Sequence, residues 1–361
     1  MLNVIFYEDI NETDVPLKKS ECHLETLKNG TNLFNNNYGD NITTFTSNLG
    51  SLTNGCRMFR YCTNLNTFTS DLSSLTYGYE MFSDCNSLLS FTPNLGSLTN
   101  GCRMFNNCQN LKPFKSDFDS LIVGEYMFYY NKNNLTSFEN NLESLSNGSG
   151  MFCFCDNLAL FKSNLNSLIV GDYMFYETKL DNFAIDLSSL INGNSMFDGC
   201  DSLTNFTSDL KSLINGVNMF NKTKLSPKSV MYIVESIRDI TYEKSLLSSD
   251  DYITYDSESQ KYSGNEGWMS DESYVYSYMW GGDYETILTV PQLFTNKISA
   301  SDVGKLTIGI DVINDSSTIE QQLQTFAKDA YYDSWEDLNK AFTDKGWTVT
   351  WQYGGTNTSI I

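Results

Sequence analysis

The chain has few of the residues on which enzymes usually depend. It contains one histidine, His23, in 361 residues, and none of its serines stands in a Gly-x-Ser-x-Gly elbow. A Ser-His or Cys-His pair needs its histidine beside the nucleophile, and His23 is better explained as a surface or N-terminal cap residue. Paired carboxylates in the acidic C-terminal part are an alternative, but no spacing singles out a pair. We therefore expect a protein that is not an enzyme and has no cofactor.

Long apolar runs and an excess of basic residues are absent as well. No run of about 18 apolar residues is present to span a membrane. The opening MLNVIFYEDINETDVP lacks a basic segment and turns acidic at once, unlike a signal peptide. Lysine and arginine number 23 against 44 aspartates and glutamates, for a net charge of −21. Such a balance excludes nucleic acid and an anionic membrane as electrostatic partners.

What the sequence does contain is a repeat. Met-Phe pairs recur at intervals of 22 to 24 residues, and each follows a glycine and precedes a small polar residue or cysteine. Self-similarity at this period is typical of stacked coils, none of which can bury its apolar side alone. A degenerate copy with Leu27, Gly30 and Phe34 precedes eight full ones. The methionines of the full copies are Met58, Met81, Met104, Met127, Met151, Met174, Met196 and Met219.

Each position of the repeat has a physical interpretation. Leu65 and Phe68 with their equivalents predict a short strand whose apolar side chains point inward. The glycine, Gly55 in the second coil, indicates a fixed turn, and we expect it to supply a positive φ. The Met-Phe pair fills the coil.

The nine cysteines are an odd number, and five of them occupy one slot of the repeat, four residues after Met. In the other full copies this slot holds Asn131, Thr178 or Thr223, so it favours a small side chain with a polar atom. A chain of this length has enough core without disulfides, and we expect free, buried thiols. Zinc at Cys153 and Cys155 is the sharper alternative, but a second pair to complete the tetrahedron is missing. We expect no metal site.

The copy LNTFTSDLSSLTYGYEMFSDCNS, residues 65–87, resembles the 23-residue BspA-type leucine-rich repeat. Its Met-Phe form is similar to "MF..C" repeats of surface proteins of low-GC bacteria and of gut bacteriophages. The resemblance implies an α/β leucine-rich-repeat-type solenoid of about nine coils, rich in β-structure. It also implies a virion protein, with the bacterial cell surface or the cytoplasm as alternative locations. We expect an N-terminal cap over residues 1–21 and the solenoid over 22–225.

Residues 226–361 break the period and predict an enlarged α/β cap that seals the last coil. Ser226 and Pro227 begin a helix that runs to Ile240. Residues 305–313 and 347–353 alternate like strands, and 318–330 and 334–346 have helical spacing.

An aromatic-rich insertion interrupts this cap over residues 241–296. Tyrosine and tryptophan among Ser, Asp and Gly are typical of adaptable binding surfaces. A hairpin whose aromatic residues pack on the cap is the alternative, and calcium at Asp250, Asp251 and Asp256 is another. The candidate binding residues here are Tyr252, Tyr255, Trp268, Tyr276, Tyr278 and Trp280.

The strand face of the solenoid carries a second set of candidates, a polar ladder that changes from copy to copy while the apolar frame stays fixed. Its residues are Thr67, Thr69, Thr92, Lys115, Glu139, Lys162, Asn182, Asn205 and Thr207. We expect a recognition or adhesion module that binds a host cell-surface protein or glycan, as a phage receptor-binding or decoration protein would. The alternatives are a bacterial cell-surface adhesin and a structural component that binds neighbouring virion proteins, and a homo-oligomer is compatible with each.

Overall fold

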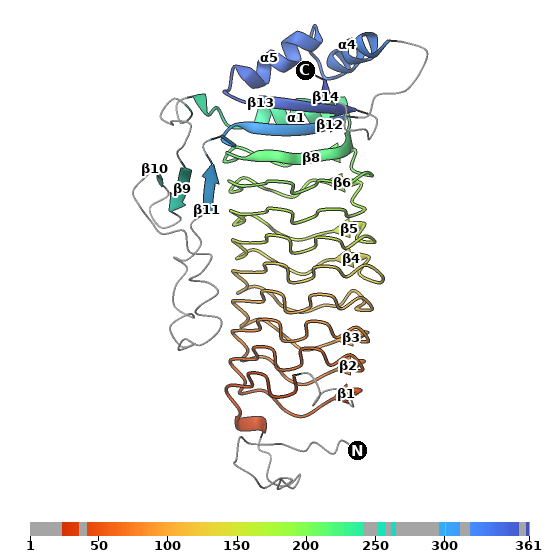
Figure 1. Ribbon diagram of the computed structural model, residues 1–361, viewed down its shortest axis with the longest axis vertical. Helices are drawn as coiled ribbons and strands as arrows, with labels where there is room; N and C mark the ends of the chain where they lie inside the picture. The colour runs from red at the N-terminus through yellow and green to blue at the C-terminus, as the bar shows by residue number, and fades with distance from the viewer. Residues whose placement is uncertain are drawn as a thin grey trace.

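The computed structural model describes residues 24–35, 42–241, 244, 252–256, 261–264, 296–299, 301–310, 318–353 and 359–360. These residues form a stack of coils that rises from a short 3₁₀ turn, η2 (Leu24–Thr26), to an α/β cap (Figure 1). The expected leucine-rich-repeat-type solenoid with an enlarged C-terminal cap is confirmed. The expected N-terminal cap, residues 1–21, lies outside the described residues.

One edge of the stack is a column of two-residue strands, each one coil above the last. They pair in parallel and in register, so that Phe45 lies beside Phe68 and Phe68 beside Phe91. The Phe is buried, and the residue before it is exposed or half-buried, as the alternation of a strand requires. The strands are β1 (Thr44–Phe45), β2 (Thr67–Phe68), β3 (Ser90–Phe91), β4 (Ser137–Phe138), β5 (Leu160–Phe161), β6 (Asn182–Phe183) and β7 (Asn205–Phe206).

This column is broken twice, into sheets β1-β2-β3, β4-β5 and β6-β7. At the first break Pro113 stands where Thr67 and Ser90 donate a backbone N–H to the preceding coil, and proline has no N–H to give. Asn140 bridges the gap: its Nδ2 donates to the Phe114 carbonyl over 3.2 Å, and its Oδ1 accepts from the Ser116 N–H over 3.0 Å. At the second break the coil after β5 is one residue short.

A second column, formed by the residue before each repeat glycine, runs unbroken through nine coils. Its members make parallel bridges from Asn29 to Asn54, Tyr77, Asn100, Val123, Asn147, Val170, Asn192 and Asn215. The asparagines also close their own turn, because Asn54 Oδ1 accepts from the Cys56 N–H over 2.9 Å and Asn100 Oδ1 from the Cys102 N–H over 3.0 Å. The count of about nine coils is therefore confirmed, including the degenerate first one.

Two columns of phenylalanine fill the interior. The rings of the Met-Phe pairs stack coil over coil; Phe59 and Phe82 lie 5.4 Å apart and 2° from parallel. The strand phenylalanines stack in the same way and meet the first column edge to face, as Phe68 does Phe82 at 4.7 Å. Both geometries suit the aromatic quadrupole. The apolar frame predicted from the sequence is thus the core.

The expected role of the repeat glycine is wrong. None of the eight glycines that begin with Gly55 and end with Gly216 has a positive φ. Glycine is needed because the methionine of the next coil packs on it: a Cβ on Gly55 would lie 2.6 Å from Met81 Sδ, and one on Gly78 would lie 3.1 Å from Met104 Sδ. A methyl group at these positions would force the methionine of the next coil to shift.

The slot four residues after Met behaves as expected. Cys85 Sγ donates to the Phe59 carbonyl of the preceding coil over 3.1 Å, and Cys108 Sγ to that of Phe82 over 3.0 Å. Asn131 Nδ2 replaces the thiol and donates to the Phe105 carbonyl over 3.2 Å. The eight cysteines among the described residues are free and buried, and burial raises the pKa of Cys200 to about 12. The five cysteines of the slot pack as small apolar residues, and each thiol donates one hydrogen bond to a backbone carbonyl of the preceding coil.

The cap closes the last coil by turning it into a strand. β8 (Gly216–Leu225) joins the sheet β14-β13-β12-β8, in which β12 (Lys305–Ile310) lies parallel to β8 and to β13 (Thr348–Tyr353). β14 (Ser359–Ile360) completes the edge. Gly309 lets β12 approach β8, since a Cβ there would lie 2.6 Å from the Thr223 carbonyl oxygen. The open apolar end of the solenoid is thereby covered.

The helices of the cap begin where the sequence predicts them. Ser226 caps α1 (Pro227–Ser236), and Pro227 is its first residue; the helix ends at Ser236 and not at the expected Ile240, because the backbone is extended at Ile237. Thr318 and Gln321 form a capping box at α4 (Ile319–Asp329), and Ser334 caps α5 (Trp335–Thr343). Within the predicted insertion the structure describes one antiparallel sheet, ordered β10-β9-β11, from β9 (Tyr252–Asp256), β10 (Lys261–Gly264) and β11 (Asn296–Ser299).

Candidate recognition surfaces

The polar ladder lies on the surface of the strand column. Seven of its residues are exposed, and Thr67 and Thr207 are half-buried. Thr67, Asn182 and Asn205 belong to strands, and the other ladder residues directly follow one, except Lys115, whose coil has no strand because Pro113 interrupts the column. The exposed members are Thr69, Thr92, Lys115, Glu139, Lys162, Asn182 and Asn205.

Two shallow hollows run along this ladder. One of about 490 Å³ is lined by Glu139, Lys162 and Asp186 with their neighbours. The other, of about 400 Å³, is lined by Thr92, Lys115 and Asp117 among others. Both hollows carry charges of both signs, beside Ala184 and Ile185 in the first and Pro93 in the second. They suit a polar ligand, and that the ladder binds one remains a prediction.

Several other candidates fall where the structure gives no side chains. Tyr252 and Tyr255 belong to β9, where they pair with Ser299 and with Tyr262 and Asn296 of the adjacent strands. Their side chains are not described. Trp268, Tyr276, Tyr278, Trp280, His23, Asp250 and Asp251 lie outside the described residues. Within the described part of the chain, no group of three His, Cys, Asp or Glu side chains is placed to hold a metal ion.

The structure shows another surface that the sequence reasoning did not single out, here called the turn face. In every full coil the residue before Met and the third residue after it have φ between 51° and 79°. This left-handed conformation is uncommon outside glycine. It lets alternate N–H groups donate to the next coil, as Arg57 does to the Tyr79 carbonyl and Tyr61 to that of Ser83. The side chains around these positions form the turn face.

In the second to fourth coils the turn face is an ion-pair network. Glu80, with 7% of its side chain exposed, accepts from Arg57 Nε over 2.8 Å and lies 3.0 Å from Arg60 Nη1. Arg103 lies 3.8 Å from it on the other side. The guanidinium of Arg57 also lies over the ring of Tyr79, whose pKa burial raises to about 12. Charges here are paired and stacked within the chain.

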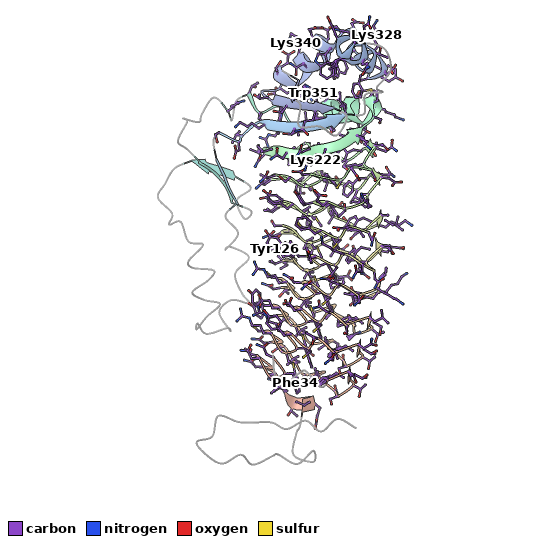
Figure 2. All side chains as sticks on the ribbon, turned by 45° about the vertical axis from the view of Figure 1, so that its right-hand side comes forward. Phe34, Tyr126, Lys222, Lys328, Lys340 and Trp351 are labelled. Carbon is purple, nitrogen blue, oxygen red and sulfur yellow. The ribbon has the colours of Figure 1, made fainter. Side chains whose placement is uncertain are left out.

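In the fifth to seventh coils the turn face becomes aromatic. Six rings form one chain of contacts in which neighbouring centroids are 5.1 to 6.1 Å apart. Tyr130 and Tyr173 are 36% and 39% exposed. Figure 2 places Tyr126, the first of the rings, about midway along the stack. The six are Tyr126, Tyr129, Tyr130, Phe154, Tyr173 and Tyr176, and we call them the aromatic cluster.

Gly150 makes room for this cluster. It occupies the position before Met, where other coils place Arg57, Glu80 or Arg103, and its φ is +59°. A Cβ on Gly150 would lie 2.3 Å from Cε1 of Tyr126, so the tyrosine ring lies across the glycine. This is a position where glycine serves both the backbone conformation and a close approach.

Cations of the chain already lie on part of the cluster. Arg103 is over the ring of Tyr126 at 5.5 Å. Lys132 Nζ lies 4.2 Å from the centroid of Tyr130 and 5.3 Å from that of Phe154, and its ammonium is 3.4 Å from Asp156. These distances are those of cation–π contacts.

Carboxylates surround the far end of the cluster. Asp172 accepts from Asn192 Nδ2 over 2.8 Å and from the Asn194 N–H over 3.1 Å, yet burial raises its pKa to about 7. Burial also raises the pKa of Asp198, which accepts from Asn221 Nδ2. After burial itself, Asp198 and Glu177 are the main charges that raise the pKa of Tyr176. This end of the turn face is both aromatic and electronegative.

A comparison with protein families agrees with the repeat geometry. The family described as "BspA type leucine rich repeat region (6 copies)" matches residues 28–148 and 121–248, which together are more than half of the chain. The chain belongs to the BspA-type leucine-rich repeat family. No curated protein and no solved structure matches it. Repeats of the BspA type support protein–protein recognition and adhesion, which fits a fixed core with variable outward residues.

The BspA-type frame also explains why the aromatic cluster was missed. Its five tyrosines lie in the near-identical stretches LIVGEYMFYY and LIVGDYMFY, whose likeness indicates duplication, and Phe154 belongs to the coil between them. Because these tyrosines flank a buried Met-Phe pair, their sequence positions suggest further core residues. The left-handed backbone before and after the pair turns them toward the surface.

Among the residues that the structure describes, no helix is long and apolar enough to cross a membrane.

Proposed function

We propose that this BspA-type repeat protein is a non-catalytic recognition module that binds a protein or glycan of a bacterial cell surface from a bacteriophage particle. The proposal is carried by one observation. Every inward position of the repeat is constant in character, whereas the outward positions of the ladder and of the turn face change from coil to coil. A surface that varies on a rigid frame is what recognition requires.

Two further features support the proposal. The ladder is exposed and hollowed, with Lys115, Glu139 and Lys162 at the hollows. The aromatic cluster exposes tyrosine, which is enriched in binding interfaces. The particle location is supported by the Met-Phe form of the repeat, which is similar to repeats of gut bacteriophage proteins.

The test is binding of the fluorescently labelled chain to a panel of intact gut bacteria, measured by flow cytometry, together with a glycan array. We expect saturable binding to some strains. The triple variant Lys115→Ala, Glu139→Ala, Lys162→Ala tests the ladder, and Tyr173→Ser with Tyr176→Ser tests the aromatic cluster. We expect at least one set to weaken binding tenfold or more.

The matched control is Lys328→Ala with Lys340→Ala, two exposed residues of the cap helices α4 and α5. Figure 2 shows them at the far end of the cap, away from Tyr126. This pair should leave binding unchanged. A chain that binds no cell or glycan but assembles with other particle proteins would contradict the proposal and indicate a structural virion component instead.

A further inference from the structure

The two ends of the aromatic cluster differ in how their rings are covered. Arg103 lies over Tyr126, and Lys132 over Tyr130 and Phe154. Of the residues that the structure describes, none places a cation over Tyr173 or Tyr176. These two rings are in contact at 5.9 Å, and Tyr173 is 39% exposed.

The repeat explains this difference. The side chain that covers Tyr126 comes from the position before Met in the preceding coil, Arg103. For Tyr173 the same position holds Gly150, and the following coil has Ser195 there. Gly150 has no side chain and that of Ser195 is small and uncharged, so neither neighbour in this column supplies a cation to the ring of Tyr173. The chain therefore repeats the aromatic half of a cation–π pair without its cation.

The charges around the open rings are those that a cation would need. Glu177 lies against Gly199, where a Cβ would be 2.7 Å from its Cδ. Asp198 is close enough to Tyr176 to raise its pKa. The nearby Lys179 donates to Asp201 over 2.9 Å, and the Glu177 carboxylate is a smaller cause than Asp201 of the raised pKa of that lysine. Burial raises the pKa of Asp198, and the hydrogen bond from Asn221 and then the charge of Lys222 lower it without overcoming burial.

We propose that Tyr173, Tyr176 and Glu177 form a slot for one cationic side chain, arginine or lysine, of a protein partner. The slot would complete across an interface the contact that Arg103 makes with Tyr126 inside the chain. A guanidinium would lie over the Tyr173 ring with a carboxylate at its edge, an arrangement in which arginine binds well. The inference rests on the proposed recognition function and names the chemistry of one contact in it.

The test uses the full chain labelled with 3-fluorotyrosine and observed by fluorine NMR. The signals of Tyr173 and Tyr176 are assigned from Tyr173→Phe and Tyr176→Phe. The chain is titrated with the peptide acetyl-Gly-Arg-Gly-amide and with its citrulline counterpart, which has the same shape and no charge. We expect the arginine peptide to shift both signals in a saturable way and the citrulline peptide to shift neither. Tyr61, which Arg60 already covers, is the internal control and should not move.

Glu177→Gln should weaken the arginine titration about threefold, because one half-buried carboxylate that water still reaches contributes modestly to binding a cation. Its thermal unfolding should match that of the wild type, which separates loss of charge from loss of fold. Equal shifts with citrulline, or no shift at Tyr173 and Tyr176, would overturn the slot. Arginine-peptide binding by a chain that ignores every cell would keep the slot and remove the proposed function. Cell binding by a chain whose signals the arginine peptide does not shift would keep the proposed function and remove the slot.

Discussion

The two halves of the turn face share one backbone and differ in chemistry. In the second to fourth coils the charges satisfy one another, with Glu80 held by three arginines. In the fifth to seventh coils rings replace the arginines, and the Glu177 and Asp198 carboxylates at their edge have no ion-pair partner within 4 Å among the described residues. The comparison shows that one repeat frame can carry either an internal network or an open surface. The side chain before Met decides which of the two forms.

The largest expected effect breaks the network half. Glu80→Ala removes the only carboxylate that Arg57, Arg60 and Arg103 share among the described residues, and leaves three partly buried cations together. We expect a loss of about 2–4 kcal/mol in the free energy of unfolding, since breaking a buried pair costs more than forming one gains. Urea unfolding would measure it. Glu177→Ala is the matched change in the open half and should cost less than about 0.5 kcal/mol; equal losses would remove the distinction between the halves.

A smaller effect is expected when the open half is overfilled. Gly150→Ala places a Cβ 2.3 Å from the Tyr126 ring at a φ of +59°, so the ring must move and the backbone is strained. We expect a loss of about 1–3 kcal/mol in the free energy of unfolding, together with a change in the fluorine signal of Tyr126. Ser195→Ala, at the same position one coil past Tyr173, is the control and should cost under about 1 kcal/mol. A variant Gly150→Ala as stable as the wild type would show that the ring does not depend on this glycine.

The smallest effect concerns pH. Burial raises the pKa of Asp172 to about 7 in the folded state, whereas an aspartate in the unfolded chain has a pKa near 3.9. Between these two pH values the folded protein therefore keeps a proton that the unfolded chain has released. Stability contributed by the protonated carboxyl is present at low pH and is lost as pH rises through 7. Asp172→Asn removes this loss of stability. Asparagine fits the position directly after the repeat glycine, because Asn194 occupies it in the next coil.

The stability gained by Asp172→Asn should therefore increase by about 1 kcal/mol between pH 6 and pH 7.5. Denaturant unfolding at the two pH values would measure it. Asp201→Asn is the control, because the Lys179 ammonium lowers the pKa of that exposed carboxyl. Its effect should not change over this range. A gain for Asp172→Asn that is the same at both pH values would mean that the carboxyl is charged throughout.

Periodicity made the interior of this protein predictable. The leucines, the two phenylalanine columns and the cysteine slot are buried in the same way in every coil. They therefore recur at a fixed interval and can be recognised in the sequence. The cap helices were equally clear, because Ser226, Thr318 and Ser334 are local signals of a helix start. The role of the repeat glycine was not, since the residue that requires it, such as Met81 for Gly55, comes from the next coil.

The sequence alone determined a BspA-type stack of about nine coils, its core, its free thiols and its terminal cap. Only the tertiary structure decided which side chains of neighbouring coils meet. In the structure Arg103 lies over the ring of Tyr126, whereas Tyr173 is partly exposed. The backbone is left-handed at Arg57 and Tyr61, although neither residue is a glycine. The physical reason is that each coil contains its own set of buried residues, which the sequence repeats. Each contact on the surface depends instead on the side chains of two neighbouring coils together.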